Sequence, residues 1–183
     1  MGRLRPDRLR EAGVKLPGDL FIETGTCSGN GVRSVVHLFK ESHSIEIDEQ
    51  MFRNARRKVS RFGIKFHLGN SPDVLRKIID PSRETVFWLD SHFVKGFGEQ
   101  SVSSAKQCPL LEELESIFSF DWRTPPMILI DDAEFFGNRF WKFHRSRGYR
   151  RADWPTFDKI KQSAESNGMT MRVIKNTVLV AKE

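Results

Sequence analysis

The stretch Glu23-Thr-Gly-Thr-Cys-Ser-Gly-Asn-Gly31 decides the fold of this chain. It follows the apolar run Leu20-Phe-Ile22 and precedes a helical pattern of apolar residues between Val32 and Phe39. Glycine has no Cβ and tolerates positive φ, so such a loop brings main-chain N–H groups close to a ligand. The helix behind the loop adds its positive N-terminal end. The stretch therefore predicts a strand, a ligand-binding loop and a helix in succession.

The spacing of the glycines bears on the choice of ligand. A dinucleotide-binding loop reads G-x-G-x-x-G, with pyrophosphate over the start of the helix. Here the glycines are Gly25, Gly29 and Gly31, and Glu23 places a carboxylate that would repel pyrophosphate and suits a cation. The pattern E-x-G-x-x-x-G-x-G resembles the first motif of the class I methyltransferases, whose cofactor S-adenosylmethionine (SAM) carries an ammonium and a sulfonium. A tight strand-to-helix turn in another α/β protein remains the alternative.

Apolar strand-like runs alternate with amphipathic helical runs, without a linker, repeat or low-complexity tract. This alternation predicts an α/β fold with a doubly wound, mostly parallel Rossmann-like sheet. Seven strands are expected, at 19–24, 43–47, 64–68, 85–89, 127–130, 169–174 and 177–181, and the last two form an antiparallel hairpin. A seven-stranded sheet with a terminal hairpin matches that of the class I methyltransferases.

Helix start signals lie between the expected strands. A helix is expected from Gly29, another capped by Asp48, another capped by Ser71, and a fourth that starts at Pro109. A last helix is expected to open at Asp153-Trp-Pro155.

The 183 residues suggest one domain over 1–183, in which 1–18 form a short N-terminal segment. Hydrophobic residues make up 38 % and charged residues 30 %, which is typical of a globular protein. No apolar run approaches the ~20 residues of a membrane span, so no membrane partner is expected. Two cysteines without metal-like spacing and the lack of a secretory signal pattern predict a cytoplasmic protein.

The net charge of +6 and the pI of about 9.5 favour acidic partners. The densest basic stretch, residues 139–151, contains arginines and lysines interleaved with aromatic residues, as surfaces that bind nucleic acid do. A solvated helix face with its aromatic residues turned inward is the alternative. Nucleic acid is therefore kept as the less favoured partner.

Residues after the second and third expected strands are candidates for cofactor binding. Glu46 stands where α/β nucleotide binders place a carboxylate that accepts hydrogen bonds from the ribose hydroxyls. Asn70 and Ser71 match the place where methyltransferases contact adenine, commonly through Asp; an amide oxygen also accepts from the adenine amino group. Ser71 either contacts the ring or caps its helix. The expected cofactor-binding set is Glu23, Gly25, Thr26, Gly29, Gly31, Glu46, Ile47, Asn70, Ser71 and Asp90.

Three carboxylates follow two strands that are expected to be neighbours. Asp90 ends the fourth strand, and Asp131 and Asp132 end the fifth. Because neighbouring strands lie ~4.8 Å apart, the three carboxylates can converge on one hard cation such as Mg²⁺. Strand-end aspartates also cap helices without a metal. Metal-dependent O-methyltransferases acting on catechols and on sugars of macrolide and aminocoumarin antibiotics place one Asp and an acidic pair at these positions, which the chain resembles.

His92 lies two residues beyond Asp90. An imidazole there can accept a proton from a hydroxyl that a metal has acidified, so His92 is the expected general base, acting beside Asp90. A solvent-facing loop histidine and a fourth metal ligand are the alternatives. Residues 93–107, rich in Gly and Ser, are expected to form a lid over the substrate.

Several segments together resemble a set of largely uncharacterised class I methyltransferase-like proteins: Phe21-Ile-Glu-Thr-Gly-Thr26, Phe87-Trp-Leu-Asp-Ser-His-Phe93, Cys108-Pro-Leu-Leu-Glu-Glu-Leu114, Ile128-Leu-Ile-Asp-Asp-Ala133 and Asp153-Trp-Pro-Thr156. The resemblance implies Mg²⁺-assisted transfer of the SAM methyl to a hydroxyl of a small-molecule or glycosidic substrate. The antibiotic-sugar enzymes carry extra helices where this chain has 1–18, so the site is either open or completed by a homodimer mate or partner subunit. The alternatives are a nucleic-acid methyltransferase that uses 139–151 and a SAM-binding protein without catalysis.

Overall fold

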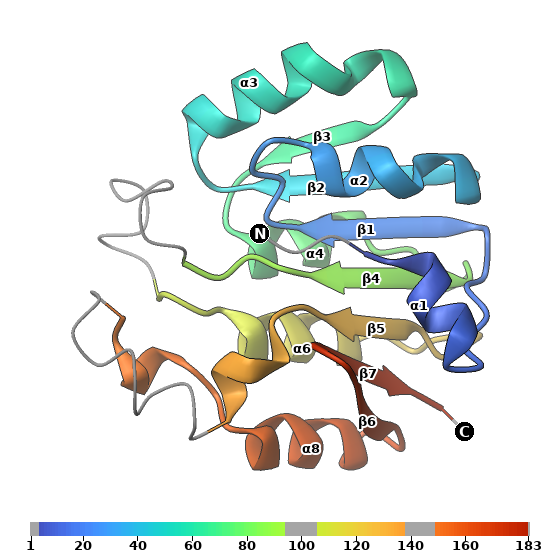
Figure 1. The fold of residues 1–183 in the computed structure, drawn as a ribbon, viewed down its shortest axis with the longest axis vertical. Coiled ribbons are helices and arrows are strands. Elements are labelled where there is room, and N and C mark those ends of the chain that lie inside the picture. Colours follow the sequence, from blue (N-terminus) through green and yellow to red (C-terminus); the bar gives the residue numbers. More distant parts are fainter. Residues whose placement is uncertain (1–3, 94–105, 138–148, 183) are drawn as a thin grey trace.

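The computed structural model describes residues 4–93, 106–137 and 149–182. Its centre is a seven-stranded sheet in the order β3-β2-β1-β4-β5-β7-β6 (Figure 1). The strands are β1 Leu20–Thr24, β2 Glu41–Glu46, β3 Lys65–Leu68, β4 Thr85–Leu89, β5 Met127–Ile130, β6 Thr170–Ile174 and β7 Thr177–Ala181. Strands β1 to β5 are parallel, whereas β7 runs antiparallel to both β5 and β6. The predicted fold class is confirmed, including the terminal hairpin.

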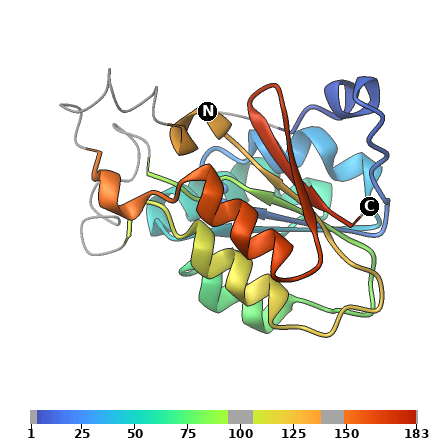
Figure 2. The same cartoon turned by 90° about the horizontal axis from the view of Figure 1, so that it is seen from below.

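Helices cover both faces of the sheet. They are α1 Pro6–Glu11, α2 Asn30–Val35, α3 Glu49–Val59, α4 Ser71–Ile78, α6 Leu110–Phe118 and α8 Phe157–Glu165. Figure 2 shows α1 and α2 on one face and α4, α6 and α8 on the other. The described part also contains four 3₁₀ segments, at Val36–Leu38, Ser60–Phe62, Ala133–Phe136 and Arg151–Asp153.

The core consists of two apolar layers, one on each side of the sheet. Phe21 and Trp88 point to the layer shared with α1 and α2, whereas Ile22 and Phe87 point to the layer shared with α4, α6 and α8. Every residue of β1 and β4 is buried, because both strands are central and covered on both faces. This is why the two strands read as continuous apolar runs.

The N-terminal segment, for which the sequence indicates no element, contains α1. Pro6 stands in its first turn, where a missing N–H costs nothing. Leu4 and Leu9 are 2 % and 3 % exposed and pack in the layer that contains Trp88. The helix is therefore fixed on the sheet.

Of the five predicted helix starts, three are confirmed and two are wrong. The helix α2 follows its N-cap Gly29, and α6 follows its N-cap Pro109. Asp48 caps α3, accepting a hydrogen bond of 2.9 Å from the Met51 N–H. Ser71 does not cap α4: the extended backbone of Asn70 lets the helix begin one residue earlier, and Ser71 lies inside it. Residues 153–155 do not open α8, because Trp154 before Pro155 is extended, and Thr156 is the N-cap instead.

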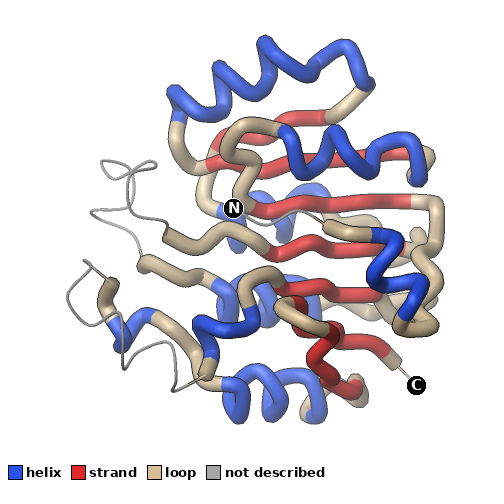
Figure 3. Tube along the Cα trace, in the orientation of Figure 1, coloured by secondary structure: helices blue, strands red, loops and turns tan. Residues whose placement is uncertain are grey.

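Because β1 to β5 are parallel, the loops that follow them leave the sheet at one edge, drawn in tan in Figure 3. This carboxyl-end edge carries the glycine loop and all the predicted site residues. None of the described helices is long and apolar enough to cross a membrane.

Candidate functional site

The glycine loop after β1 passes directly below the loop after β4. The N–H groups of Gly25 and Thr26 both donate to the carbonyl of Ile45, at 2.9 and 3.1 Å. A Cβ at Gly25, whose φ is +83°, would lie 2.3 Å from the Asp90 carbonyl oxygen. Only glycine allows this approach, so the loop sequence and the placement of Asp90 depend on each other.

Glu23 lies beneath the loop rather than on its surface. It is 3 % exposed, and Ser44 Oγ, which is also 2.6 Å from Thr26 Oγ1, donates to its Oε2 over 2.6 Å. Burial raises the pKa of Glu23 to about 8, against the effect of the Ser44 hydrogen bond. Glu23 thus ties the loop to β2, and its contact with a methionine moiety stays a prediction.

Glu46 is fixed at the end of β2 by main-chain N–H groups. Its Oε2 accepts from Cys27 at 2.7 Å, and its Oε1 accepts from Ile47 and Asp48, both at 3.0 Å. A carboxylate has about four acceptor positions, so one remains on Oε2 for a ligand hydroxyl. Ile47, beside it, is 38 % exposed, and an exposed apolar side chain at this edge suits the face of a purine.

Asn70 and Ser71 face different environments. Asn70 is exposed, and its amide nitrogen donates to Asp73 Oδ2 at 3.2 Å, which leaves its carbonyl oxygen available as an acceptor. Ser71 is 5 % exposed, and its hydroxyl lies 3.4 Å from that of Ser91. Adenine contact is therefore open to Asn70 more than to Ser71.

Asp90, His92 and Asp132 form the one cluster of metal-ligand type found among the described residues. One ligand atom of each lies within 4.8 Å of the others. His92 Nε2 is 3.2 Å from Asp90 Oδ1 and 3.3 Å from Asp132 Oδ2. The nitrogen is buried and aligned for a hydrogen bond with neither carboxylate. His92 Nδ1 faces the Phe93 carbonyl at 3.5 Å, an orientation common in metal-binding histidines.

The electrostatics of this cluster favour a positive charge at His92. Burial opposes the charged imidazole, but the contacts with Asp132 and Asp90 outweigh it and raise the pKa of His92 to about 10. Burial raises the pKa of Asp90, whereas for Asp132 the His92 contact outweighs burial and lowers the pKa. A protonated imidazole is neither a proton acceptor nor a metal ligand, so His92 must release this proton before it acts in either role, and its role as general base stays a prediction. The donor set, two carboxylates and one imidazole, fits a divalent cation.

The two consecutive aspartates after β5 point in different directions. Asp132 has φ +52°, in the left-handed region, so its carboxylate turns toward His92. Asp131 lies outside the metal-type cluster: it is 5 % exposed, and its Oδ2 has no hydrogen-bond partner among the described residues. Burial, with Asp90 and Asp132 nearby, raises the pKa of Asp131 to about 7. Of the three predicted metal ligands, the structure thus brings together two.

Asn176, in the turn between β6 and β7, holds the loop that carries Asp132. Its amide donates to Asp132 Oδ1 at 3.1 Å, and its side-chain oxygen accepts from the Glu134 N–H at 3.0 Å. Its carbonyl also accepts from the Ala133 N–H at 3.0 Å. The sequence marks this residue only as part of a hairpin turn, so no pattern reveals the role.

Glu113 is a second residue that sequence reasoning missed. It lies on α6, is 1 % exposed, and accepts a hydrogen bond of 2.6 Å from the hydroxyl of Ser91, next to Asp90. Burial raises its pKa. The available signal is its spacing: with Leu110, Leu114 and Ile117 it occupies the apolar face of the helix, where a carboxylate needs a partner.

Aromatic rings enclose His92 on the side of β5. The ring centroids of Phe135 and Trp154 each lie 5.2 Å from that of His92. Residues 94–105 of the predicted lid 93–107 and residues 139–148 of the basic-aromatic stretch 139–151 lie outside the described residues.

No protein-family model matches the sequence, and no curated protein matches it. Solved structures do match. A SAM-dependent methyltransferase from Aquifex aeolicus is 14 % identical, with 96 % of this chain and 87 % of that chain covered and a TM-score of 0.58. A Streptococcus mutans protein in complex with S-adenosylhomocysteine (SAH) is 15 % identical, with 98 % and 99 % covered and a TM-score of 0.60.

A third match is the magnesium protoporphyrin IX methyltransferase from Synechocystis with bound SAH. It is 13 % identical, with 96 % of this chain and 78 % of that chain covered and a TM-score of 0.55. Identities this low establish the architecture of the chain and nothing finer. The chain has the fold of the class I methyltransferases.

Proposed function

We propose that this protein is a SAM-dependent methyltransferase that methylates a hydroxyl oxygen of a small molecule, with a divalent metal ion at Asp90, His92 and Asp132. The observation that carries the proposal is the position of this cluster. It lies at the carboxyl-end edge of the sheet, and the main chain of Asp90 lies so close to the glycine loop that a Cβ at Gly25 would come within 2.3 Å of its carbonyl oxygen. In open α/β sheets, ligands bind at this edge.

The proposed cofactor-binding residues lie at the same edge of the sheet. Glu46 would accept a ribose hydroxyl at the free position of Oε2, and Ile47 would pack against adenine, with Asn70 accepting from its amino group. Glu23, below the loop, would favour the positive charges of SAM through its field, in its ionised form. The SAH bound in two proteins of the same fold supports SAM as the cofactor.

The metal is proposed as Mg²⁺ or Mn²⁺. Two carboxylates suit both ions, and the imidazole of His92 is a ligand that first-row transition metals accept more readily than Mg²⁺ does. A bound ion of this kind supplies Lewis-acid stabilisation to a substrate alkoxide or phenolate. Asp90, His92 and Asp132 would hold it, and the hydrogen bond from Asn176 to Asp132 would keep that carboxylate oriented.

The test is a direct assay of SAH formation. The protein is incubated with SAM and a pool of catechols, hydroxy acids and glycosides, in Mg²⁺, in Mn²⁺ and in chelator. The proposal predicts SAH release that requires an acceptor and a divalent ion and is lost in Asp132→Asn. The matched control is Asp158→Asn, an exposed residue in the first turn of α8. Full turnover in chelator would remove the metal from the proposal, and bound SAH without any turnover would favour a non-catalytic SAM-binding protein.

A further inference from the structure

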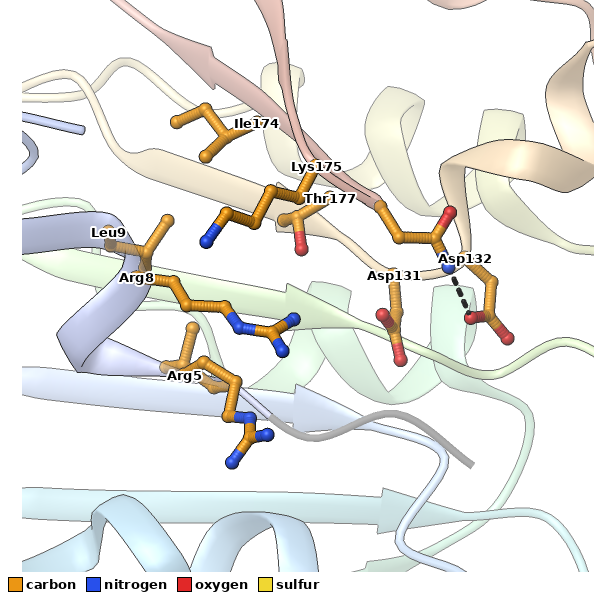
Figure 4. Close-up of a pocket in the computed structure, with 10 residues that line it drawn as sticks. Arg5, Arg8, Leu9, Asp131, Asp132, Ile174, Lys175 and Thr177 are labelled. Atoms are coloured by element: carbon orange, nitrogen blue, oxygen red, sulfur yellow. Dashed lines mark hydrogen bonds between the residues drawn. The ribbon is translucent and has the colours of Figure 1, made fainter. Parts of the chain in front are cut away.

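A cavity of about 310 Å³ opens between α1 and the turn that joins β6 to β7 (Figure 4). Arg5 and Arg8 line it on the side of α1, and Asp131 and Asp132 line it on the side of β5. A volume of this size accommodates a small molecule. Since Asp132 also belongs to the proposed metal cluster, the cavity reaches the proposed centre of the chemistry.

Among the described residues, the two arginines have no ion-pair partner. Within residues 4–93, 106–137 and 149–182, neither Arg5 nor Arg8 lies within ion-pair distance of a carboxylate. Figure 4 shows the guanidinium of Arg8 extending into the cavity on the side facing Asp131, with Arg5 beside it. Guanidinium groups bind carboxylate and phosphate through paired N–H donors.

The segment that carries the arginines, with Arg5 at the N-cap of α1 and Arg8 within the helix, is packed against the core. Leu4 and Leu9, which flank them in sequence, are buried in the core layer and also line the cavity. The guanidinium groups therefore extend from a fixed backbone. This arrangement reduces the entropy that ligand binding would otherwise cost.

The opposite wall suits a hydroxyl group. Asp131 Oδ2 has no hydrogen-bond partner in the described part of the chain, and Asp132 contacts His92. A ligand that spans the cavity thus meets cations at one end and carboxylate acceptors beside the metal cluster at the other. A neutral glycoside would leave both guanidinium groups unused.

We infer that this cavity is the acceptor site and that the methyl acceptor is a small hydroxylated acid, with its carboxylate or phosphate bound by Arg5 and Arg8. This inference rests on the proposed function and narrows its substrate class. The hydroxyl end of the acid lies toward Asp131 and Asp132, and the anionic end toward α1.

The test compares acceptors that differ only in the anionic group. Catechol is paired with 3,4-dihydroxybenzoate for the carboxylate, and glycerol with glycerol 3-phosphate for the phosphate. Wild type should favour one acid over its neutral partner. In Arg5→Gln/Arg8→Gln, the KM for that acid should rise about 10-fold to 100-fold with little change in kcat, as expected for the loss of charged hydrogen bonds. The KM for the neutral partner should stay unchanged.

Arg10→Gln is the matched control, because Arg10 lies on the same helix and does not line the cavity. Calorimetric titration of each acid, and of SAH, into wild type and the variants gives a readout that needs no turnover. An acid that binds wild type and loses affinity in the double variant supports the site even if the proposed function fails. Equal affinity in wild type and double variant would overturn the inference. Weakened SAH binding with unchanged acid binding would also overturn the inference, because that result would assign the arginines to the carboxylate of the cofactor.

Discussion

Glu23 and Gly31 are packed so closely that a Cβ at Gly31 would lie 2.3 Å from Glu23 Oε1. The buried carboxylate occupies the space that a side chain at the start of α2 would need. The two ends of the glycine loop are thus in direct contact, and the loop takes its shape from this contact as well as from any ligand.

Gly31→Ala should therefore displace Glu23 and distort the loop. We expect a loss of about 1–3 kcal/mol in the free energy of unfolding, as for overpacked sites, together with weaker SAH binding. Gly137→Ala is the control, because a Cβ there meets nothing closer than 3.5 Å and its φ is −94°. Urea denaturation and SAH titration measure both effects, and a Gly31→Ala protein with unchanged stability and SAH affinity would contradict the packing argument.

Single substitutions of the carboxylates should distinguish the two candidate sets of metal ligands. The structure groups Asp90 and Asp132 with His92, whereas the sequence groups them with Asp131. Asp90→Asn and Asp132→Asn each remove a carboxylate charge from the cluster with His92, so Mn²⁺ affinity should fall by about 100-fold. Asp131→Asn should bind Mn²⁺ nearly as well as wild type, because Asp131 lies outside that cluster. Mn²⁺ titration followed by electron paramagnetic resonance measures the affinities; the reverse order of effects would restore the set predicted from the sequence.

Glu113→Ala should destabilise the protein, because Glu113 is buried and accepts a hydrogen bond. Removal of the carboxylate leaves the Ser91 hydroxyl without its acceptor, which costs about 1–3 kcal/mol in the free energy of unfolding. Glu115→Ala, on the exposed side of the same helix, should change it little. Equal stability of the two variants in urea would show that Glu113 is not the acceptor that holds Ser91.

The buried Glu23 should make stability depend on pH in a defined direction. Its pKa is raised from 4.5 to about 8, so between these values the folded protein binds more protons than the unfolded chain does. Its contribution to stability is thus full below about pH 4.5 and is lost as pH rises through about 8. Glu23→Gln does not titrate, so its melting temperature should fall less than that of wild type between pH 6 and pH 9. Parallel curves for the two proteins would contradict the burial of a titrating Glu23, and Glu49→Gln, an exposed residue, serves as control.

The fold was largely predictable because apolar runs of strand length alternate with helical patterns. Buried central strands such as β1 and β4 are recognisable from composition alone. The residues at which helices begin were harder to predict. Asp48 and Ser71 are equally good caps by residue type, yet only Asp48 has the extended backbone of a cap.

For the candidate site, the sequence predicts which residues lie at the ends of the strands, but not how their side chains are oriented. The sequence places Asp90 and Asp132 at one edge, but it cannot show that a left-handed conformation turns Asp132 away from Asp131. The hydrogen bond from Asn176 to Asp132 comes from the β6–β7 hairpin, which is distant from Asp132 in the sequence. The charge state expected of His92 depends on two carboxylates that reach it from different strands, so its pKa could not be inferred from its place in the chain.

The most direct measurement is a calorimetric titration of SAH into the wild-type protein and into Glu46→Gln and Glu49→Gln. The account predicts saturable binding at one site per chain, weakened at least about 10-fold in Glu46→Gln and unchanged in Glu49→Gln. Absence of SAH binding by folded wild-type protein would contradict it, and so would binding that is indifferent to Glu46.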